Sequence, residues 1–168
     1  MNTTGVSREP VLTTSPTHWL MCRAADRLLA LELGCVVETM RPLPLRAFSG
    51  VPRFVLGVAV IRGAVVPVLD VGSVLGVPDA RPTRFVTIEL DDRIVALAVD
   101  AVLGVRTLDE ATWHDVPPLL GALDTGAIAA IGTLDSGLLM VLGQARLVPD
   151  RLWAQLDAQS AASLAVSS

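Results

Sequence analysis

The side chains that could perform acid–base or nucleophilic chemistry are few and widely spaced in this sequence. Asp124-Thr125-Gly126 is the triplet of aspartic proteases, whose chemistry needs two such carboxylates sharing one proton. Too few of the 168 residues follow Gly126 to build the second half of such an enzyme. Because a tripeptide is weak evidence, we interpret the triplet as a coincidence and expect Asp124→Ala to leave every activity of the protein unchanged.

Other catalytic and metal-binding patterns are also missing. All 13 basic residues are arginine, which excludes chemistry that depends on lysine, such as Schiff-base formation or phosphate binding by a P-loop. His18 and His114 have no second ligand at metal spacing. Cys22 and Cys35 do not form a C-x-x-C pair, and a disulfide between them is possible but not implied. These residues thus exclude several catalytic chemistries, and we expect no metal or cofactor.

The composition limits the compartment and the partners. Hydrophobic residues make up 52% of the chain and charged residues 18%, yet no uncharged stretch reaches the ~20 residues that a membrane-spanning helix needs. Residues 1–17 lack the apolar core of a secretory signal. A net charge of −4 and the absence of tyrosine argue against binding to nucleic acid. We expect a cytoplasmic protein without direct membrane insertion.

The longest apolar stretch, residues 54–75, holds one basic residue, Arg62. Two β-branched runs flank the Arg62-Gly63 step, which is typical of a tight hairpin in which Gly63 has a structural role. Their nearly continuous hydrophobicity predicts strands that are buried on both faces. We expect Asp70, also structural, to cap a short helical turn over 71–75. By itself, Arg62 would be a solvated turn residue.

Three further hairpins and a C-terminal helix complete the predicted elements. The hairpins turn at Ala25-Asp26, Asp91-Asp92 and Asp135-Ser136. Residues 34–41 form either a short helix or a bent strand, and the helix runs from Asp150 to about Ala162. We expect residues 1–17 to be a disordered lead, residues 18–158 to form a single domain, and residues 159–168 to be a flexible tail.

The chain also contains a repeat. Shifted by 66 positions, residues 27–40 align with residues 93–106, and shifted by 73 positions, residues 61–75 align with residues 134–148. This pattern predicts an all-β fold of two small antiparallel barrels, one from each half of the chain, which meet near 76–83. Because barrels of this size are marginal alone, they should share an apolar seam, and we expect a binding groove there.

The ordering of these segments resembles the CheW family of bacterial chemotaxis adaptors. The supporting stretches span roughly Trp19 to Trp153, and the family pattern G-V-x-N-L-R-G-x-V-V-P-V-x-D-L matches Gly57–Val71. The stretches are LALELGCVVETMRP (29–42), VPRFVLGVAVIRGAVVPVLDV (51–71), RFVTIELDDRIVALAVDAVLGV (84–105) and IGTLDSGLLMVL (131–142). The sequence departs from the family at Val60, where the pattern has Asn, and at Gly143, where the repeat partner is Asp70.

The resemblance implies both a fold and a function. The fold would be two five-stranded SH3-like β-barrels that share a hydrophobic core, with short helices and a C-terminal helix. The protein would be a non-catalytic adaptor that couples the cytoplasmic tips of methyl-accepting chemoreceptors to the regulatory domain of a CheA-type histidine kinase, recruited to membrane receptor arrays. Val36, Glu38 and Arg62 match family positions on the receptor-binding side. A groove with an apolar floor and a few charges would suit a receptor helix.

Two alternatives remain open at this point. The same scaffold could serve a receptor–kinase pathway unrelated to motility. The seam could also be the pocket of a small-molecule-binding double barrel, which thermal shifts with metabolites and a lack of kinase binding would favour. Between the two copies the hairpin turn changes from Arg62-Gly63 to Asp135-Ser136 while the strand pattern is kept. Arg62 is therefore the first candidate for a partner contact.

Overall fold

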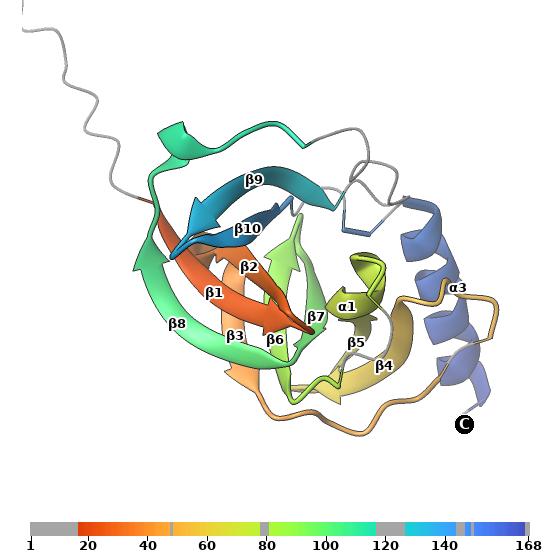
Figure 1. Cartoon of the computed structure of the whole chain (residues 1–168). Helices are drawn as coiled ribbons and strands as arrows, with labels where there is room; N and C mark the ends of the chain where they lie inside the picture. The colour runs from red at the N-terminus through yellow and green to blue at the C-terminus, as the bar shows by residue number, and fades with distance from the viewer. Residues whose placement is uncertain are drawn as a thin grey trace, which may run out of the picture.

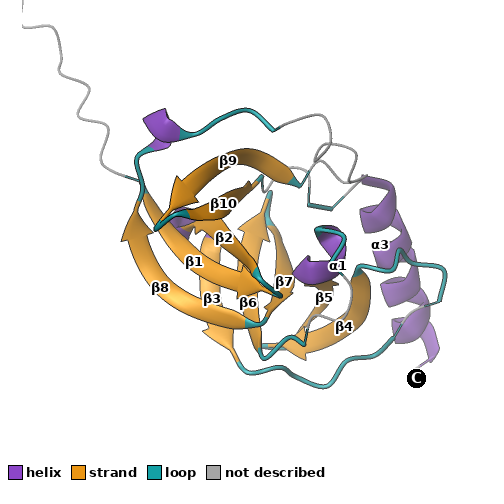
Figure 2. Cartoon of the chain, in the orientation of Figure 1, coloured by secondary structure: helices purple, strands orange, loops and turns teal. Residues whose placement is uncertain are grey.

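Ten strands in two sheets build most of this structure, a computed structural model that describes residues 17–47, 49–77, 81–116, 127–143, 147–148 and 150–166 (Figure 1). Figure 2 shows how little of the described chain is helical. The strands are β1 (His18–Ala24), β2 (Arg27–Glu32), β3 (Val36–Met40), β4 (Val55–Ile61), β5 (Ala64–Asp70), β6 (Arg84–Leu90), β7 (Arg93–Val99), β8 (Ala101–Thr107), β9 (Ile128–Leu134) and β10 (Gly137–Leu142). The helical segments are the 3-10 turns η1 (Leu33–Cys35) and η2 (Glu110–Thr112), the short helix α1 (Val71–Val74) and the C-terminal helix α3 (Asp150–Val166).

All four predicted hairpins are confirmed. The strands β1–β2, β4–β5, β6–β7 and β9–β10 pair antiparallel across two-residue turns. In three of these turns both central residues have positive φ, for example Arg62 (49°) and Gly63 (80°), the backbone that matches the twist of the flanking strands. Residues 34–41, for which helix and bent strand were both open, divide into the end of η1 and the strand β3.

The predicted division of the chain into one barrel per half is wrong. One sheet has the order β8-β1-β2-β10-β9 and the other β3-β6-β7-β5-β4, so β6 and β7, which follow residues 76–83, lie in the same sheet as β3, β4 and β5. The chain changes sheet at η1, between β2 and β3, and again at Asp100, between β7 and β8. In Figure 1 the first sheet lies at the upper left, and the second lies beside α1 and α3.

The repeat itself is present in the structure. The first five strands and the last five occupy equivalent positions, because β2 pairs in parallel with β10 just as β7 pairs in parallel with β5. Each sheet therefore combines the first two strands of one copy with the last three strands of the other. Nothing local in the sequence indicates this exchange, since a strand pattern shows which face is buried but not which distant strand is the neighbour.

The buried side chains form three layers that follow this arrangement. Each sheet has an apolar cluster of its own. The cluster with Phe85 belongs to the sheet β3-β6-β7-β5-β4, and the cluster with Trp19 belongs to the sheet β8-β1-β2-β10-β9. The largest cluster combines side chains from both sheets, including Leu29, Leu97 and Met140, and α3 adds Leu152 and Leu156 to it. Neighbouring strand residues point alternately into an inner layer and this shared layer. The shared core is thus confirmed, and so is the predicted burial of the strands on both faces, except next to the β4–β5 turn, where Val60 and Val65 are exposed.

Candidate functional site

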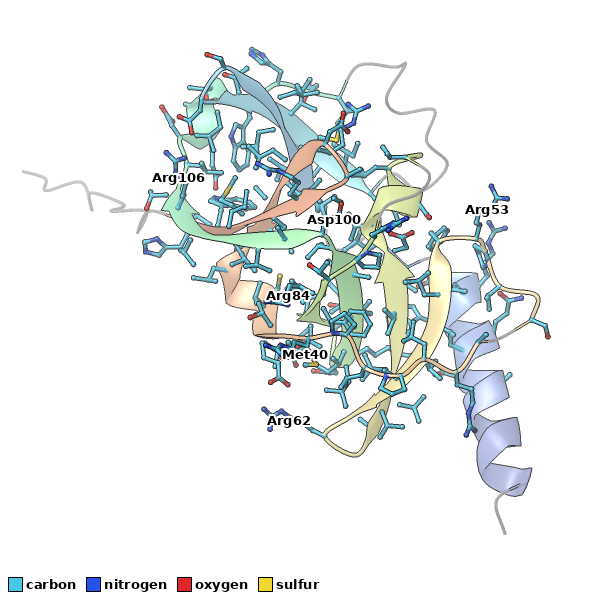
Figure 3. The ribbon with its side chains drawn as sticks, turned by 60° about the horizontal axis from the view of Figure 1, so that its bottom comes forward. Met40, Arg53, Arg62, Arg84, Asp100 and Arg106 are labelled. Carbon is cyan, nitrogen blue, oxygen red and sulfur yellow. The ribbon has the colours of Figure 1, made fainter. Side chains whose placement is uncertain are left out.

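The candidate site is at the tip of the β4–β5 hairpin. The Arg62 side chain is 78% exposed and reaches the carboxylate of Glu38 on β3. Its Nε donates to Oε1 at 2.8 Å and its Nη2 donates to Oε2, also at 2.8 Å, so both ends of the guanidinium fork are used. Figure 3 shows Arg62 at the outer end of its hairpin. Two of the three predicted receptor-side residues therefore form one bidentate ion pair.

The position of Glu38 is fixed by a bulge in β3. The register shifts between Val36, which lies opposite Ile88, and Glu38, which lies opposite Thr87. The buried Thr87 hydroxyl accepts from the Glu38 backbone N–H and donates to the Glu38 carbonyl, both at 3.2 Å. Burial alternates along β3, so Val37 lies on its outer side, 52% exposed, while Glu38 is partly buried.

The electrostatics of the pair make it a fixed contact and not an acid–base group. The hydrogen bond from Arg62 holds the pKa of Glu38 below its ordinary value, and the same bond raises the pKa of Arg62. Both groups are therefore charged at any pH near neutrality. A carboxylate in this state can accept hydrogen bonds and attract cations, but it cannot donate a proton.

The pair also connects the two outermost strands of its sheet. β3 and β4 are the outermost strands of the order β3-β6-β7-β5-β4, and the ion pair joins Glu38 on β3 to the turn that follows β4. The other sheet has an equivalent ion pair with the charges exchanged. There Arg106 on β8 donates to Asp135, in the turn after β9, at 3.1 Å. Each curved sheet is thus bridged at its open side by one ion pair.

The strands next to each pair carry exposed apolar side chains. We call Val37, Val60 and Val65 with the Glu38–Arg62 pair the first patch, and Leu103, Val105 and Leu138 with the Arg106–Asp135 pair the second patch. These six apolar residues are between 44% and 65% exposed. In Figure 3 Arg62 and Arg106 lie well apart, Arg106 at the upper left and Arg62 near the bottom of the view. Apolar groups next to anchored charges are typical of protein–protein contact surfaces.

The remaining predicted residues have structural positions. Val36 is half-buried against the shared core, two residues before Glu38. Gly63 takes the second turn position, with open space where a side chain would begin. Asp70 is the N-cap of α1, as predicted, because its carboxylate accepts from the Gly72 N–H at 3.1 Å and from the Ser73 hydroxyl at 2.7 Å.

The site contains one residue that motif matching identified only as a departure. Val60, where the family pattern has Asn, is 65% exposed and lies directly across from Val65 in the β4–β5 ladder. The departure therefore enlarges the apolar area of the first patch. In the sequence, this position could be recognised as an apolar residue two positions before Arg62, close to a turn, where polar residues are usual.

The seam between the sheets differs from the open groove expected there. Its interior is filled by the shared apolar cluster. At its rim is a hollow of about 470 Å³ between the β2–β3 link, with Glu32 and Cys35, and the β6–β7 turn. A second hollow, of about 540 Å³, lies between that turn and α3. Neither hollow is lined by Val36, Glu38 or Arg62.

The described residues show no assembled metal-binding group. Among them, no three His, Cys, Asp or Glu side chains could hold a metal ion. Burial raises the pKa of the Cys22 thiol to about 12 and that of Cys35 to about 11, so neither is a ready nucleophile. Asp124, the carboxylate of the protease-like triplet, lies outside the described residues. No helix within the described ranges is long and apolar enough to cross a membrane.

This interleaved two-sheet fold, with an ion pair and an apolar patch on each sheet, defines a protein-interaction scaffold. Residues 18–151 match the model of the CheW-like domain. The chain is 32% identical over 111 residues to a chemotaxis protein CheW of Rhizobium meliloti, covering 64% of this chain and 72% of the relative. It is 31% identical over 125 residues to the protein FrzA of Myxococcus xanthus, covering 72% of this chain and 76% of the relative. The chain belongs to the CheW family.

A solved structure agrees in fold. The crystal structure of the scaffolding protein TtCheW from Thermoanaerobacter tengcongensis superposes with a TM-score of 0.67 at 24% identity, covering 76% of this chain and 89% of that protein. The suspected family and the predicted fold class, two five-stranded β subdomains with a C-terminal helix, are therefore confirmed. The protein is a scaffold of chemotaxis-like signal transduction.

Proposed function

We propose that this protein couples the cytoplasmic tips of chemoreceptors to the regulatory domain of a CheA-type histidine kinase, and that it carries no catalytic activity of its own. It would act in the cytoplasm at membrane receptor arrays. Coupling requires two different contact surfaces on one rigid body, and the observation that carries the proposal is the pair of patches with exchanged charges. The receptor state can bias the kinase state if both bind this fixed body.

The first patch is the proposed receptor contact. It combines a strongly exposed guanidinium, already held in place by Glu38, with the apolar side chains of Val37, Val60 and Val65. A positioned arginine next to apolar area is the kind of residue that dominates binding energy at interfaces. Receptor tips are helical hairpins, and a helix can present apolar residues and a carboxylate on one face. The second patch then remains available to the kinase.

The test compares charge reversals at the two patches. We expect Arg62→Glu to weaken co-sedimentation with receptor-containing membranes by about tenfold or more, since it removes a favourable charge and introduces a repulsive one. Arg106→Glu is the matched control, because it reverses the arginine of the ion pair in the second patch. Thermal unfolding by circular dichroism checks that both variants remain folded. Unchanged receptor binding by Arg62→Glu would contradict the assignment of the first patch as the receptor contact.

A charge-swapped double variant separates partner contact from structural support. Arg62→Glu combined with Glu38→Arg rebuilds the ion pair with opposite polarity on the same backbone positions. If Arg62 contacts the receptor directly, we expect binding to stay lost although the pair is restored. Recovery of receptor binding in the double variant would show that Arg62 acts only by bridging β3 and the β4–β5 turn.

A further inference from the structure

A groove lies between the β6–β7 hairpin and α3, and none of its lining residues belongs to the first or the second patch. The groove there has a volume of about 540 Å³. Leu90, Val148 and Trp153 contribute apolar surface to it, and carboxylates stand along both walls: Glu89 and Asp91 on the hairpin, Asp150 and Asp157 on the helix. It is therefore a groove in which acidic and apolar side chains lie side by side.

One arginine of the chain already shows how this groove holds a cation. The Arg93 guanidinium lies over the Trp153 ring, 4.7 Å from its centroid. It also forms an ion pair with Asp157, with nitrogen–oxygen distances of 3.0 and 3.2 Å. Aromatic face and carboxylate together are a favourable environment for a guanidinium. Glu89, Asp91 and Asp150 have no ion pair with any residue that the structure describes.

The negative charge of the protein is concentrated around this groove. The neighbouring hollow shares Glu89 and Asp91 with it and adds Glu32 and Asp92. The two hollows together carry six carboxylates and one guanidinium, a local charge of −5, whereas the whole chain carries −4. The rest of the chain therefore carries a net charge close to zero, and the local charge at these two hollows attracts cationic groups.

We propose that this groove binds a basic, amphipathic segment of a partner protein. The sign of the field opposes nucleic acids and anionic membrane surfaces, which attract basic patches. The described carboxylates do not converge as a metal site. The apolar lining residues, chiefly Leu90 and Trp153, favour a partner with apolar side chains between its cations, spaced as on one face of a helix. This surface is separate from the first patch and goes beyond the proposed receptor contact.

The probe is a fluorescein-labelled helical peptide with one stripe of leucine and one of arginine. Its binding to the full-length protein is measured by fluorescence anisotropy at low and at moderate salt. We expect the double variant Glu89→Gln/Asp91→Asn to bind about tenfold more weakly, because it removes two unpaired rim carboxylates. Asn tolerates the positive φ of Asp91 (45°), so the fold should be kept. Asp26→Asn/Glu110→Gln removes the same charge from other exposed positions and should bind like the wild type.

Several results would overturn the proposal. One is equal weakening in both double variants, which would mean that only net charge matters. Another is equal binding of a peptide with glutamate in place of arginine. A third is loss of peptide binding in Arg62→Glu, which would place the peptide on the first patch. The last is self-association of the wild type that the groove variant abolishes, because the occupant would then be a second copy of this chain.

Discussion

At the scale of the residue, the structure changes the meaning of Arg62. The sequence identified it as the one cation within a long apolar stretch, and its exposure at a hairpin tip follows from that pattern. Its bidentate partner Glu38 lies on a strand 24 positions earlier and was selected only through the family resemblance. The Thr87 hydroxyl that anchors the Glu38 backbone had no signal at all, because a Thr within a buried strand normally indicates only β propensity.

The Glu38–Arg62 pair should give the protein a specific dependence on pH. The pKa of Glu38 is lowered in the folded state from its ordinary value of 4.5, so around and below that value the unfolded chain binds more protons than the folded one. Stability from this pair is then fully present above the unfolded pKa and is lost as the pH falls through the folded pKa. We expect Glu38→Gln to lower the urea midpoint at pH 7 clearly more than at pH 3.

The matched control for this prediction is Glu110→Gln. Glu110 is an exposed carboxylate in η2 for which the described residues show no salt bridge. Its loss should shift the urea midpoint little at either pH. A Glu38→Gln effect of the same size at pH 3 and pH 7 would mean that the variant acts through packing or hydrogen bonding, not through the charge of Glu38.

At the scale of the element, turn chemistry is where local sequence was most informative. The four hairpins were predicted correctly because their two-residue turns interrupt strongly apolar strands. The β9–β10 turn, however, has Ser136 at φ 65°, where the equivalent turn has Gly63. A non-glycine residue in this left-handed region costs about 1–2 kcal/mol relative to its preferred backbone. Glycine avoids this steric cost, but it also makes the unfolded chain more flexible, so the entropy lost on folding offsets part of the gain.

Exchanging these turn residues should therefore have opposite effects in the two sheets. We expect Ser136→Gly to stabilise the protein by about 0.5 kcal/mol and Gly63→Ser to destabilise it by about 1 kcal/mol. A steric clash cannot explain the expected loss of stability in Gly63→Ser, since no atom lies within 4 Å of the Cβ that the serine would add. Urea denaturation of the two single variants measures both changes. Loss of stability in Ser136→Gly would show that the serine side chain has a role that the backbone argument omits.

The sequence of the strand β8 gives little local indication that it forms a strand. Among the strands that the structure describes, β8 forms no hairpin and pairs with β1 alone, and its exposed Leu103 and Val105 alternate with a glycine. An edge strand of this kind has neither a buried face in its sequence nor a neighbouring turn, so its pattern resembles a loop. The same property gives it a role, because it supplies two apolar residues and Arg106 to the second patch.

At the scale of the whole molecule, the decisive feature is the exchange of strands between the two copies. The sequence repeat predicted two equivalent units, which is correct, but a repeat cannot show whether each unit folds on itself. The 3-10 turn η1 and the residue Asp100 send the chain into the other sheet instead. The two patches are consequently parts of one rigid body, since both sheets also share their largest core cluster. That rigidity is what an adaptor needs in order to relate one partner to another.

The exchange makes a prediction that separate barrels would not. A fragment of residues 1–80 contains β1 and β2 of one sheet and β3, β4 and β5 of the other, but β6 and β7, which lie between β3 and β5, are missing. Neither sheet is complete in this fragment, nor in the fragment of residues 81–168. We expect both fragments to be unfolded alone by circular dichroism and to regain the native spectrum when mixed, because each supplies what the other lacks. Two fragments that folded independently would mean that each half forms its own barrel, and the interleaved topology would then be wrong.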